Sequence, residues 1–307
     1  MVVRVLNQVP PASAAIAAVE GVECIDVTAD LGDDVTAEVL FGGYPDWART
    51  LELVERGVRW VQLSGTGIDG APPELFDRVP VVTCARGASA VPISEYVLAV
   101  LLAFVKHLPE FWISEPPRAW NFQRMGTLAG RTVGIVGFGG IGRAIARRAL
   151  AFDMDVVVVR RTDAPIDVAG VRRAESLEAM LPELDHLVLA APATAATEHL
   201  VDADALALVR PGLHLVNIAR GSLVDQDALR VALDDGRVAR ASLDVMTPEP
   251  LPAGHWLYTH PGVRLTPHSS WANPDLLDAS IALFVANLER FRDGQPLADV
   301  VDPALGY

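Results

Sequence analysis

The chain of 307 residues contains only two cysteines, no excess of basic charge and no long apolar run. Cys24 and Cys84 are far apart and lack the short spacing of metal-binding or redox pairs, so we expect both to be small core residues in a reducing compartment. The net charge of −14 argues against nucleic-acid binding and gives a small anionic substrate no overall attraction. A site for such an anion must therefore be built locally, from a few basic side chains.

The sequence also lacks signals for membrane insertion and export. Its most apolar stretch, Tyr96–Val105, ends at Lys106 and is shorter than the roughly 20 apolar residues that span a bilayer. The first residues, Met1 to Arg4, do not follow the basic-then-apolar plan of a signal peptide. We therefore expect a cytoplasmic protein without a membrane partner.

The most informative pattern is a glycine-rich motif in the middle of the chain. An apolar run beginning at Thr132 leads directly into the motif, and the helical segment Arg143–Phe152 follows it. A strand, a glycine turn and a helix in this order allow a tight turn, close approach of backbone N–H groups to a pyrophosphate, and close helix–strand packing. We expect this motif to bind NADP(H) or NAD(H), an ordinary tight turn being the less favoured alternative. Its residues are Gly137, Phe138, Gly139, Gly140, Ile141 and Gly142.

Short apolar runs alternate with helical segments on both sides of the motif, which predicts an α/β protein with parallel sheets. The expected strands before the motif are Val2–Leu6, Glu23–Val27, Glu38–Phe41, Arg59–Leu63 and Val79–Thr83. Those after it are Asp155–Val159, His186–Ala190, Leu213–Ile218, Arg240–Val245 and Val263–Thr266. Expected helices include Ala12–Val19, Trp47–Arg56, Ile93–His107 and Asp275–Asp293.

The mid-chain position of the motif predicts that the cofactor domain interrupts another domain. We expect two Rossmann-like or flavodoxin-like domains: an NAD(P)-binding domain at residues 98–275, and a discontinuous substrate domain at residues 1–97 and 276–307. The active site is expected in the cleft between them.

Three late strands each lead into an ionic residue: Arg220, Glu249 and His268. Taken singly, these residues are better explained as a surface arginine, a loop glutamate and a turn histidine. Because ligands bind outside the carboxyl ends of parallel strands, their shared location favours a common site. A guanidinium can grip a carboxylate and polarise the adjacent carbonyl, while an imidazole oriented by a carboxylate can transfer the proton that accompanies a hydride.

These motifs resemble those of the D-isomer-specific 2-hydroxyacid dehydrogenases. The likeness covers nearly the whole chain and is carried by Val133–Gly142, Val216–Asp225, Leu243–Val245, Glu249–Leu251 and Leu265–His268. The resemblance implies that Arg220 binds substrate, His268 is the acid/base and Glu249 is its partner. It also implies that Asp244 lies near the nicotinamide amide, that Ala191 and Pro192 border the adenosine, and that a homodimer forms.

Further site residues follow from the same resemblance. The expected cofactor contacts outside the glycine motif are Ala191, Pro192, Ile218, Ala219, Arg220, Asp244 and His268. The turn Ser64, Gly65, Thr66 and Gly67 is expected to offer backbone N–H groups to the substrate carboxylate, beside Arg220 and His268. Trp271 either walls the substrate pocket or covers the domain junction, and Tyr44 and Trp47 are either pocket or core residues.

The end of the second strand of the cofactor domain departs from the NAD-binding pattern. An acidic residue that accepts from the ribose 2′-OH is expected about 20 residues after the glycines. Here the strand ends in Arg160, Arg161 and Thr162, and the nearest acid, Asp163, lies beyond them. Two guanidiniums and a hydroxyl suit a 2′-phosphate, so NADP(H) is predicted over NAD(H). The alternative is that both arginines are solvated strand-end charges.

The sequence thus predicts an NADPH-preferring reductase of small 2-keto acids such as glyoxylate or hydroxypyruvate, giving D-2-hydroxy acids with no metal. Two alternatives stay open. One is oxidation of formate or phosphite on the same scaffold, and the Glu249–His268 pair argues against formate because that oxidation releases no alcohol proton. The other is a non-enzymatic, corepressor-like dinucleotide sensor, which can keep the same three ionic residues.

Overall fold

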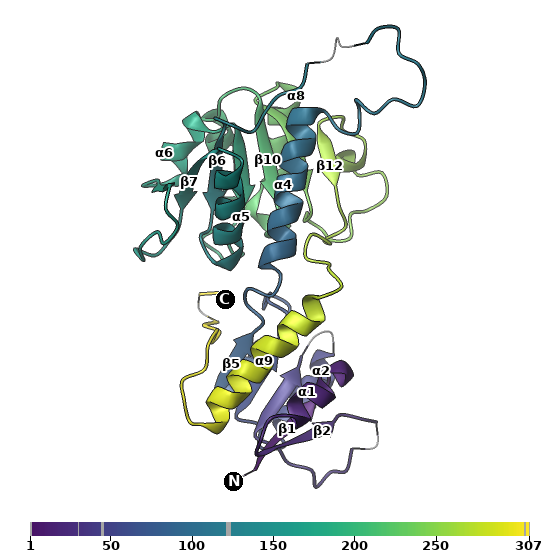
Figure 1. The fold of residues 1–307 in the computed structure, drawn as a ribbon, viewed down its shortest axis with the longest axis vertical. Helices are drawn as coiled ribbons and strands as arrows, with labels where there is room; N and C mark the ends of the chain where they lie inside the picture. Colours follow the sequence, from purple (N-terminus) through teal and green to yellow (C-terminus); the bar gives the residue numbers. More distant parts are fainter. Residues whose placement is uncertain (1, 30, 44–45, 121–123, 304, 307) are drawn as a thin grey trace. The chain divides into compact units, whose positions relative to one another are not determined.

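A computed structural model describes residues 2–29, 31–43, 46–120, 124–303 and 305–306. The chain forms two compact units (Figure 1): unit 1 comprises Met1–Ser89 and Asn273–Tyr307, and unit 2 comprises Ala90–Ala272. Unit 2 therefore interrupts unit 1 in the sequence. The expected boundary between residues 97 and 98 falls inside the helix α4 (Ala90–Lys106), which belongs to unit 2 along its whole length.

Unit 1 is built on a parallel five-stranded sheet in the order β2-β1-β3-β4-β5. The direction in which strands are added reverses between β1 and β3, as in flavodoxin-like folds. The strands are β1 (Val3–Asn7), β2 (Val22–Asp26), β3 (Val39–Gly42), β4 (Trp60–Leu63) and β5 (Val81–Cys84). The helices are η1 (Pro10–Ala12), α1 (Ser13–Ala17), α2 (Trp47–Val54), α3 (Pro73–Arg78) and α9 (Leu276–Arg292).

Helices cover both faces of the unit 1 sheet, which explains why the central strands β3 and β4 are buried along their whole length. Helices α1 and α9 pack on one face, where the ring of Phe284 stacks on Phe41 with 4.2 Å between centroids. Helices α2 and α3 pack on the other face through Leu53 and Leu75. The last helix of the chain is thus part of the core of unit 1.

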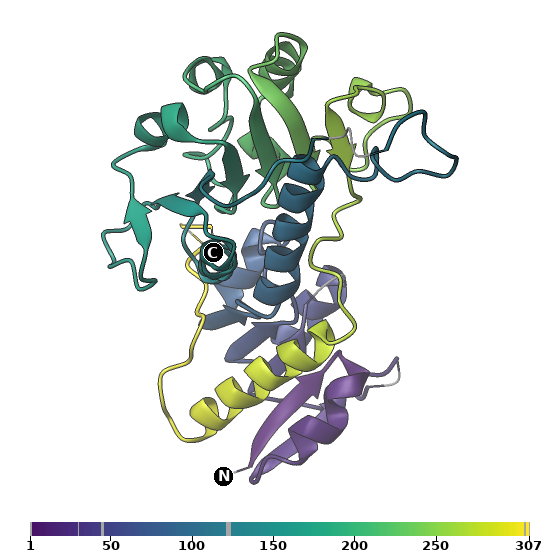
Figure 2. The same ribbon diagram turned by 45° about the horizontal axis from the view of Figure 1, so that its top comes forward.

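Unit 2 contains a parallel seven-stranded sheet in the order β12-β11-β10-β9-β6-β7-β8 (Figure 2). Its strands are β6 (Thr132–Val136), β7 (Asp155–Val159), β8 (Val171–Arg173), β9 (His186–Leu189), β10 (Leu213–Asn217), β11 (Val238–Leu243) and β12 (Val263–Leu265). Its other elements are α4, α5 (Gly140–Ala151), α6 (Leu177–Met180), η2 (Leu181–Glu183), α7 (Ala203–Ala207), η3 (Gly221–Leu223), α8 (Gln226–Asp234) and η4 (Trp256–Tyr258). The strand order reverses between β6 and β9, the place where dinucleotides bind in Rossmann folds.

The two faces of this sheet are also covered. Helices α4 and α5 pack on one face against side chains such as Ile135 and Val158. Helices α6, α7 and α8 pack on the other against Leu187 and Leu215. The α/β class and the two parallel sheets expected from the sequence are confirmed, with each expected strand displaced by at most a few residues.

Several short elements were not predicted, namely α3, β8, α6, α7 and α8. Most are too short for a helical or alternating pattern to be recognised. Helix α8 does carry a readable signal, because Asp225 precedes it and its carboxylate accepts from the N–H groups of Asp227 and Ala228. An acidic N-cap of this kind marks the start of a helix.

Two histidines without a predicted role lie inside unit 2. His186 on β9 and His214 on β10 are buried, with 3.3 Å between their Nδ1 atoms, and Nε2 of His214 lies 2.9 Å from Oγ of Ser242. Burial lowers the pKa of His186 to about 4 and also lowers that of His214. Both are therefore neutral core residues at pH 7. Cys84 is likewise buried, and Cys24 is half-buried; both are free thiols.

In the described part of the chain, no helix combines the length and apolar character needed to cross a membrane.

Candidate active site

The glycine motif follows β6, at the reversal of strand order in unit 2. Gly137 has a φ of 95°, and a Cβ there would lie 2.7 Å from the carbonyl oxygen of Ala190. A Cβ on Gly142 would lie 2.2 Å from the carbonyl oxygen of Gly137. These two glycines are therefore required by the turn and by the packing of α5 on the sheet.

Gly139 has a different environment. It is the N-cap of α5, and a Cβ built on it would meet no described atom within 4 Å. Packing within the protein therefore does not explain a glycine here. Open space in front of a backbone at a helix N-terminus is what a pyrophosphate requires, so the residues present fit a dinucleotide.

The other expected cofactor residues border this motif or the neighbouring strand ends. Ala191 and Pro192 lie in the loop after β9, where the backbone of Ala190 and Ala191 packs against Gly137. Ile218 and Ala219 are buried directly after β10. Phe138 is buried, so it faces the core and can offer a cofactor only its backbone.

The end of β7 carries an arginine with an unusual environment. Nη1 of Arg160 is buried and has no hydrogen-bond partner among the residues that the structure describes. A buried guanidinium nitrogen without a partner is costly and calls for an acceptor. Arg161 and Thr162 are exposed beside it, whereas Asp163 is held by Arg173 at 2.9 Å.

Arg220 lies in a turn fixed by its neighbours. The side chain of Asn217, the last residue of β10, donates from Nδ2 to the carbonyl oxygen of Arg220 (2.8 Å) and accepts from the N–H of Ala219 (3.0 Å). A Cβ on Gly221 would lie 2.1 Å from the backbone carbon of Met246. The turn that carries Arg220 therefore lies directly against the loop after β11.

Glu249 and His268 form a direct pair. Oε2 of Glu249 lies 2.8 Å from Nδ1 of His268, and Oε1 of Glu249 accepts from the N–H of Met246 at 2.9 Å. Because a carboxylate only accepts, Nδ1 of His268 carries the hydrogen and Nε2 is left for another partner. About a third of each side chain is exposed, 37% for His268 and 33% for Glu249, so the pair is accessible to a small molecule.

The loop of His268 is anchored by a buried carboxylate. Asp244, directly after β11, is fully buried, and its two oxygens accept from the N–H groups of Ser269 and Ser270, each at 2.9 Å. Its carbonyl oxygen accepts from the N–H of His268 at 2.8 Å. The contact of Asp244 with a nicotinamide amide stays a prediction, but its structural partners are these loop residues.

The loops that follow the neighbouring strands β10, β11 and β12 all lie at the carboxyl ends of the unit 2 sheet. They carry Arg220, then Asp244 and Glu249, and then His268. Trp271 belongs to the same loop as His268, and its indole N–H donates to the carbonyl oxygen of His268 at 2.8 Å. The indole is 44% exposed, so it supports this loop while keeping an open face.

The expected substrate turn belongs to unit 1, where it follows β4. The N–H of Ser64 donates to the carbonyl oxygen of Gly42 (3.0 Å), and the carbonyl oxygen of Gly65 accepts from Ala85 (2.9 Å). Oγ1 of Thr66 donates to the carbonyl oxygen of Ala85 at 2.8 Å. The turn is thus fixed from both sides, and its role toward a carboxylate stays a prediction, as does that of Gly67.

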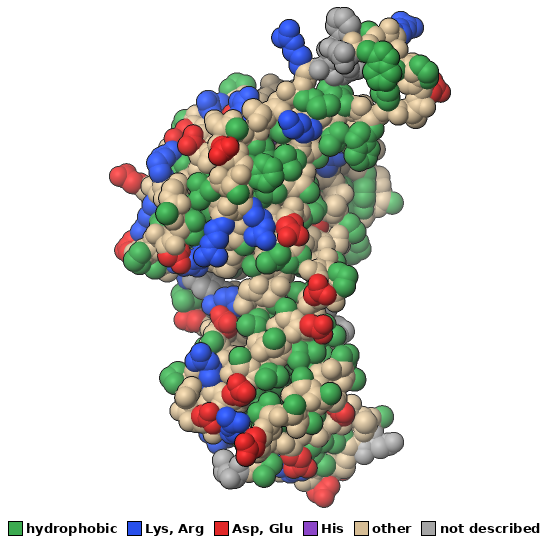
Figure 3. All heavy atoms as spheres, in the orientation of Figure 1, with side chains coloured by type: hydrophobic (Ala, Val, Ile, Leu, Met, Phe, Trp, Pro, Cys, Tyr) green, Lys and Arg blue, Asp and Glu red, His purple; other side chains and the backbone are tan. Residues whose placement is uncertain are grey.

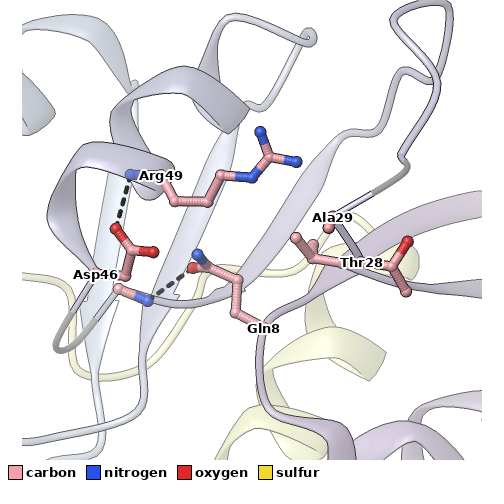
Figure 4. Close-up of a pocket in the computed structure, with 7 residues that line it drawn as sticks. Gln8, Thr28, Ala29, Asp46 and Arg49 are labelled. Atoms are coloured by element: carbon pink, nitrogen blue, oxygen red, sulfur yellow. Dashed lines mark hydrogen bonds between the residues drawn. The ribbon is translucent and has the colours of Figure 1, made fainter.

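A pocket of about 360 Å³ lies at the carboxyl ends of β1, β2 and β3, at the strand-order reversal of unit 1 (Figure 4). The Gln8 amide oxygen accepts from the N–H of Gly43 (3.0 Å), and Asp46 accepts from the N–H of Arg49 (3.0 Å). No pattern in the sequence predicts this pocket. Trp47 packs against the core on this side of the sheet, and Tyr44 lies outside the described residues.

Among the described residues, no group of three or more His, Cys, Asp or Glu side chains is arranged to hold a metal ion.

Comparison with known proteins identifies the family of the chain. Residues 98–270 match the family model for the D-isomer specific 2-hydroxyacid dehydrogenase, NAD binding domain. A glyoxylate/hydroxypyruvate reductase A from Serratia proteamaculans is 31% identical over 264 residues, which cover 83% of this chain and 84% of that protein. The chain therefore belongs to the D-isomer-specific 2-hydroxyacid dehydrogenases, a family of NAD(P)-dependent oxidoreductases.

Solved structures show the same fold. A D-isomer specific 2-hydroxyacid dehydrogenase from Xanthobacter autotrophicus, in complex with NADPH and MES, has a TM-score of 0.83 and 27% identity, with 99% of each chain covered. An NADPH-dependent glyoxylate/hydroxypyruvate reductase from Sinorhizobium meliloti, in complex with NADP and sulfate, has a TM-score of 0.79 and 25% identity, covering 99% of this chain and 100% of that one.

The contrast between two glycines of the motif gives a test of the cofactor site. Gly142→Ala is expected to lower the free energy of unfolding by about 1–3 kcal/mol, because its Cβ overlaps the backbone. Gly139→Ala is expected to leave stability within about 0.5 kcal/mol of wild type and to raise the Kd for NADPH about tenfold or more, because its Cβ enters the space of the pyrophosphate. Thermal unfolding and titration of NADPH fluorescence measure the two effects. Normal NADPH binding by Gly139→Ala would contradict this assignment.

Proposed function

We propose that the protein is an NADPH-preferring reductase of small 2-keto acids, of the glyoxylate and hydroxypyruvate type, giving D-2-hydroxy acids. The observation that carries the proposal is the Glu249–His268 pair, at 2.8 Å, beside the turn that holds Arg220. Relatives with 31% and 28% identity are glyoxylate/hydroxypyruvate reductases, which supports this class of substrate.

A dinucleotide held by the glycine motif at the start of α5 would supply the hydride for reduction of the substrate carbonyl. Arg220 grips the substrate carboxylate and polarises the carbonyl oxygen, which offsets the negative charge that develops there. His268 donates a proton from Nε2 to that oxygen, since its Nδ1–H points to Glu249. Glu249 holds the ring in this orientation.

The preference for NADPH rests on the end of β7. Arg160 has a buried Nη1 without a partner among the described residues, and a 2′-phosphate oxygen is an acceptor of the required charge. Arg161 and Thr162 are exposed at the same strand end and add a charge and a hydroxyl. Asp163, the nearest acid, is engaged by Arg173 and so is a poor acceptor for a ribose 2′-OH. Together these features favour a phosphate over a free hydroxyl.

Loss of the proposed acid should separate chemistry from binding. His268→Asn is expected to lower kcat by about 10²–10⁴-fold, because proton transfer is lost, and to leave the Kd for NADPH unchanged. Glu249→Gln should show a smaller loss of kcat. His260→Asn is a matched control, because His260 pairs with Asp234 at 3.2 Å elsewhere in unit 2. Steady-state rates and NADPH titration measure these effects, and wild-type kcat in His268→Asn would remove the proposed acid.

Cofactor selectivity has its own test. Arg160→Ala and Arg161→Ala are each expected to lower the ratio of kcat/KM for NADPH over NADH by about tenfold or more, through loss of charge-assisted hydrogen bonds to the phosphate. The rates with NADH should change little. The control is Arg172→Ala. Arg172 lies on β8, the strand next to β7, and its side chain pairs with Glu183. A wild-type preference for NADH, or an unchanged ratio in both variants, would refute the assignment.

We also propose a homodimer that uses the described parts of the segment between α4 and β6, residues 107–120 and 124–131. Trp112, Ile113, Trp120 and Met125 on this segment are each more than half exposed, and Figures 1 and 3 show it projecting from unit 2 with hydrophobic side chains on its surface. Glu110 pairs with Arg240 (3.2 Å) and with Arg264, which fixes the base of the segment. Exposed apolar side chains on a fixed support are typical of a protein interface.

The dimer is tested by sedimentation equilibrium. Wild type is expected at twice the mass of the chain, and Trp112→Asp is expected to shift the equilibrium toward the monomer, because a carboxylate would be buried in an apolar contact. Val231→Asp introduces the same charge at an exposed apolar residue on α8 and should leave the mass unchanged. A monomeric wild type at micromolar concentration would contradict the proposal.

A further inference from the structure

A chain of hydrogen bonds connects helix α4 to the loop that carries His268. Oη of Tyr96 on α4 lies 2.9 Å from Oγ1 of Thr266, and Oγ1 of Thr266 lies 2.5 Å from Oδ1 of Asp244. The same Oδ1 accepts from the N–H of Ser269, the residue after His268. Two hydrogen bonds therefore separate Tyr96 from the Asp244 carboxylate, which anchors the loop that carries His268.

The donors and acceptors define the direction of this chain. Both oxygens of Asp244 already accept backbone N–H groups, so the single hydroxyl hydrogen of Thr266 points to Oδ1. Thr266 is then an acceptor toward Tyr96, and Tyr96 is the donor. Burial raises the pKa of Tyr96, and the negative charge of Asp244 acts in the same direction. The tyrosine hydroxyl therefore keeps its hydrogen.

The loop depends on such anchors because its backbone is not relaxed. His268 has a φ of 51°, a left-handed conformation that costs a residue with a Cβ about 1–2 kcal/mol. Its N–H is held by the carbonyl oxygens of Asp244 (2.8 Å) and Thr266 (3.0 Å). A shift of Thr266 or Asp244 would therefore displace the backbone of His268, and with it the imidazole ring.

Tyr96 has a rigid support. It lies on a helix of 17 residues whose neighbouring side chains Ile93, Val97 and Leu101 are buried in the core of unit 2. Helix α4 begins at Ala90, the first residue of unit 2, and the His268 loop runs to Ala272, its last residue. The Tyr96–Thr266 bond thus ties the first and last segments of this unit together.

We propose that Tyr96 is a positioning residue for the reduction, acting through Thr266 and Asp244 to hold His268 in the orientation that proton transfer requires. This inference rests on the proposed role of His268 as the acid. Tyr96 makes its described hydrogen bond to Thr266, so its effect on the reaction is transmitted and not direct.

The first test removes single hydroxyl groups. Tyr96→Phe and Thr266→Val are each expected to lower kcat about tenfold while the KM for NADPH stays unchanged, because a small displacement of a proton donor is costly. Thr266→Ser keeps the hydroxyl and is expected to retain more activity than Thr266→Val. Tyr258→Phe removes a tyrosine hydroxyl that donates to the carbonyl oxygen of Leu251 and should keep wild-type kcat.

The second test distinguishes positioning from general stability. In a His268→Asn background the acid is absent, so Tyr96→Phe should have no further effect on the residual rate. The double variant Tyr96→Phe/Thr266→Val should lose no more kcat than either single variant. A merely structural role would instead lower the rate equally with and without His268, in step with the melting temperature.

Two outcomes would overturn the inference: kcat within about twofold of wild type in Tyr96→Phe, or an equal loss on adding Tyr96→Phe in the His268→Asn background. Should Tyr96→Phe fail to fold, equal kcat in Thr266→Val and Thr266→Ser would overturn it. Wild-type turnover by His268→Asn alone is a different result, since it rejects the proposed function itself.

Discussion

The buried carboxylate of Asp244 is the interaction on which the arrangement of the site depends. A carboxylate with no exposed surface is tolerated only when its oxygens are fully hydrogen-bonded, because an unpaired buried charge costs several kcal/mol. Here the partners are the Thr266 hydroxyl and the N–H groups of Ser269 and Ser270. The segment around His268 must therefore fold onto the end of β11 for this charge to be accommodated.

The same strand edge positions the remaining groups. Gly221 has no side chain, which lets the Arg220 turn lie against the backbone of Met246, and the N–H of Met246 in turn holds Glu249. Sheet order places β10, β11 and β12 side by side, so three loops that are far apart in sequence share one edge. The parallel sheet thereby brings Arg220 to the same edge as the Glu249–His268 pair.

Much of this arrangement could be predicted from the sequence, because it follows from local patterns. The apolar runs predict the strands. Because ligands bind at the carboxyl ends of parallel strands, the sequence also predicts a common site for Arg220, Glu249 and His268. The contact between Tyr96 and Thr266 joins residues 170 positions apart and has no local pattern. The burial of Nη1 of Arg160 could not be predicted either, because the burial of a single atom depends on packing. The role of Asp244 as an anchor required its hydrogen bonds, which spacing alone does not reveal.

The most direct test of the account is a turnover assay with hydroxypyruvate and glyoxylate, followed by determination of the configuration of the glycerate formed. We expect NADPH to be oxidised with both substrates, faster than NADH, and the glycerate to be the D isomer. Tight binding of NADPH without turnover on any 2-keto acid would instead indicate a dinucleotide sensor. Oxidation of phosphite or formate without reduction of 2-keto acids would contradict the proposed reaction.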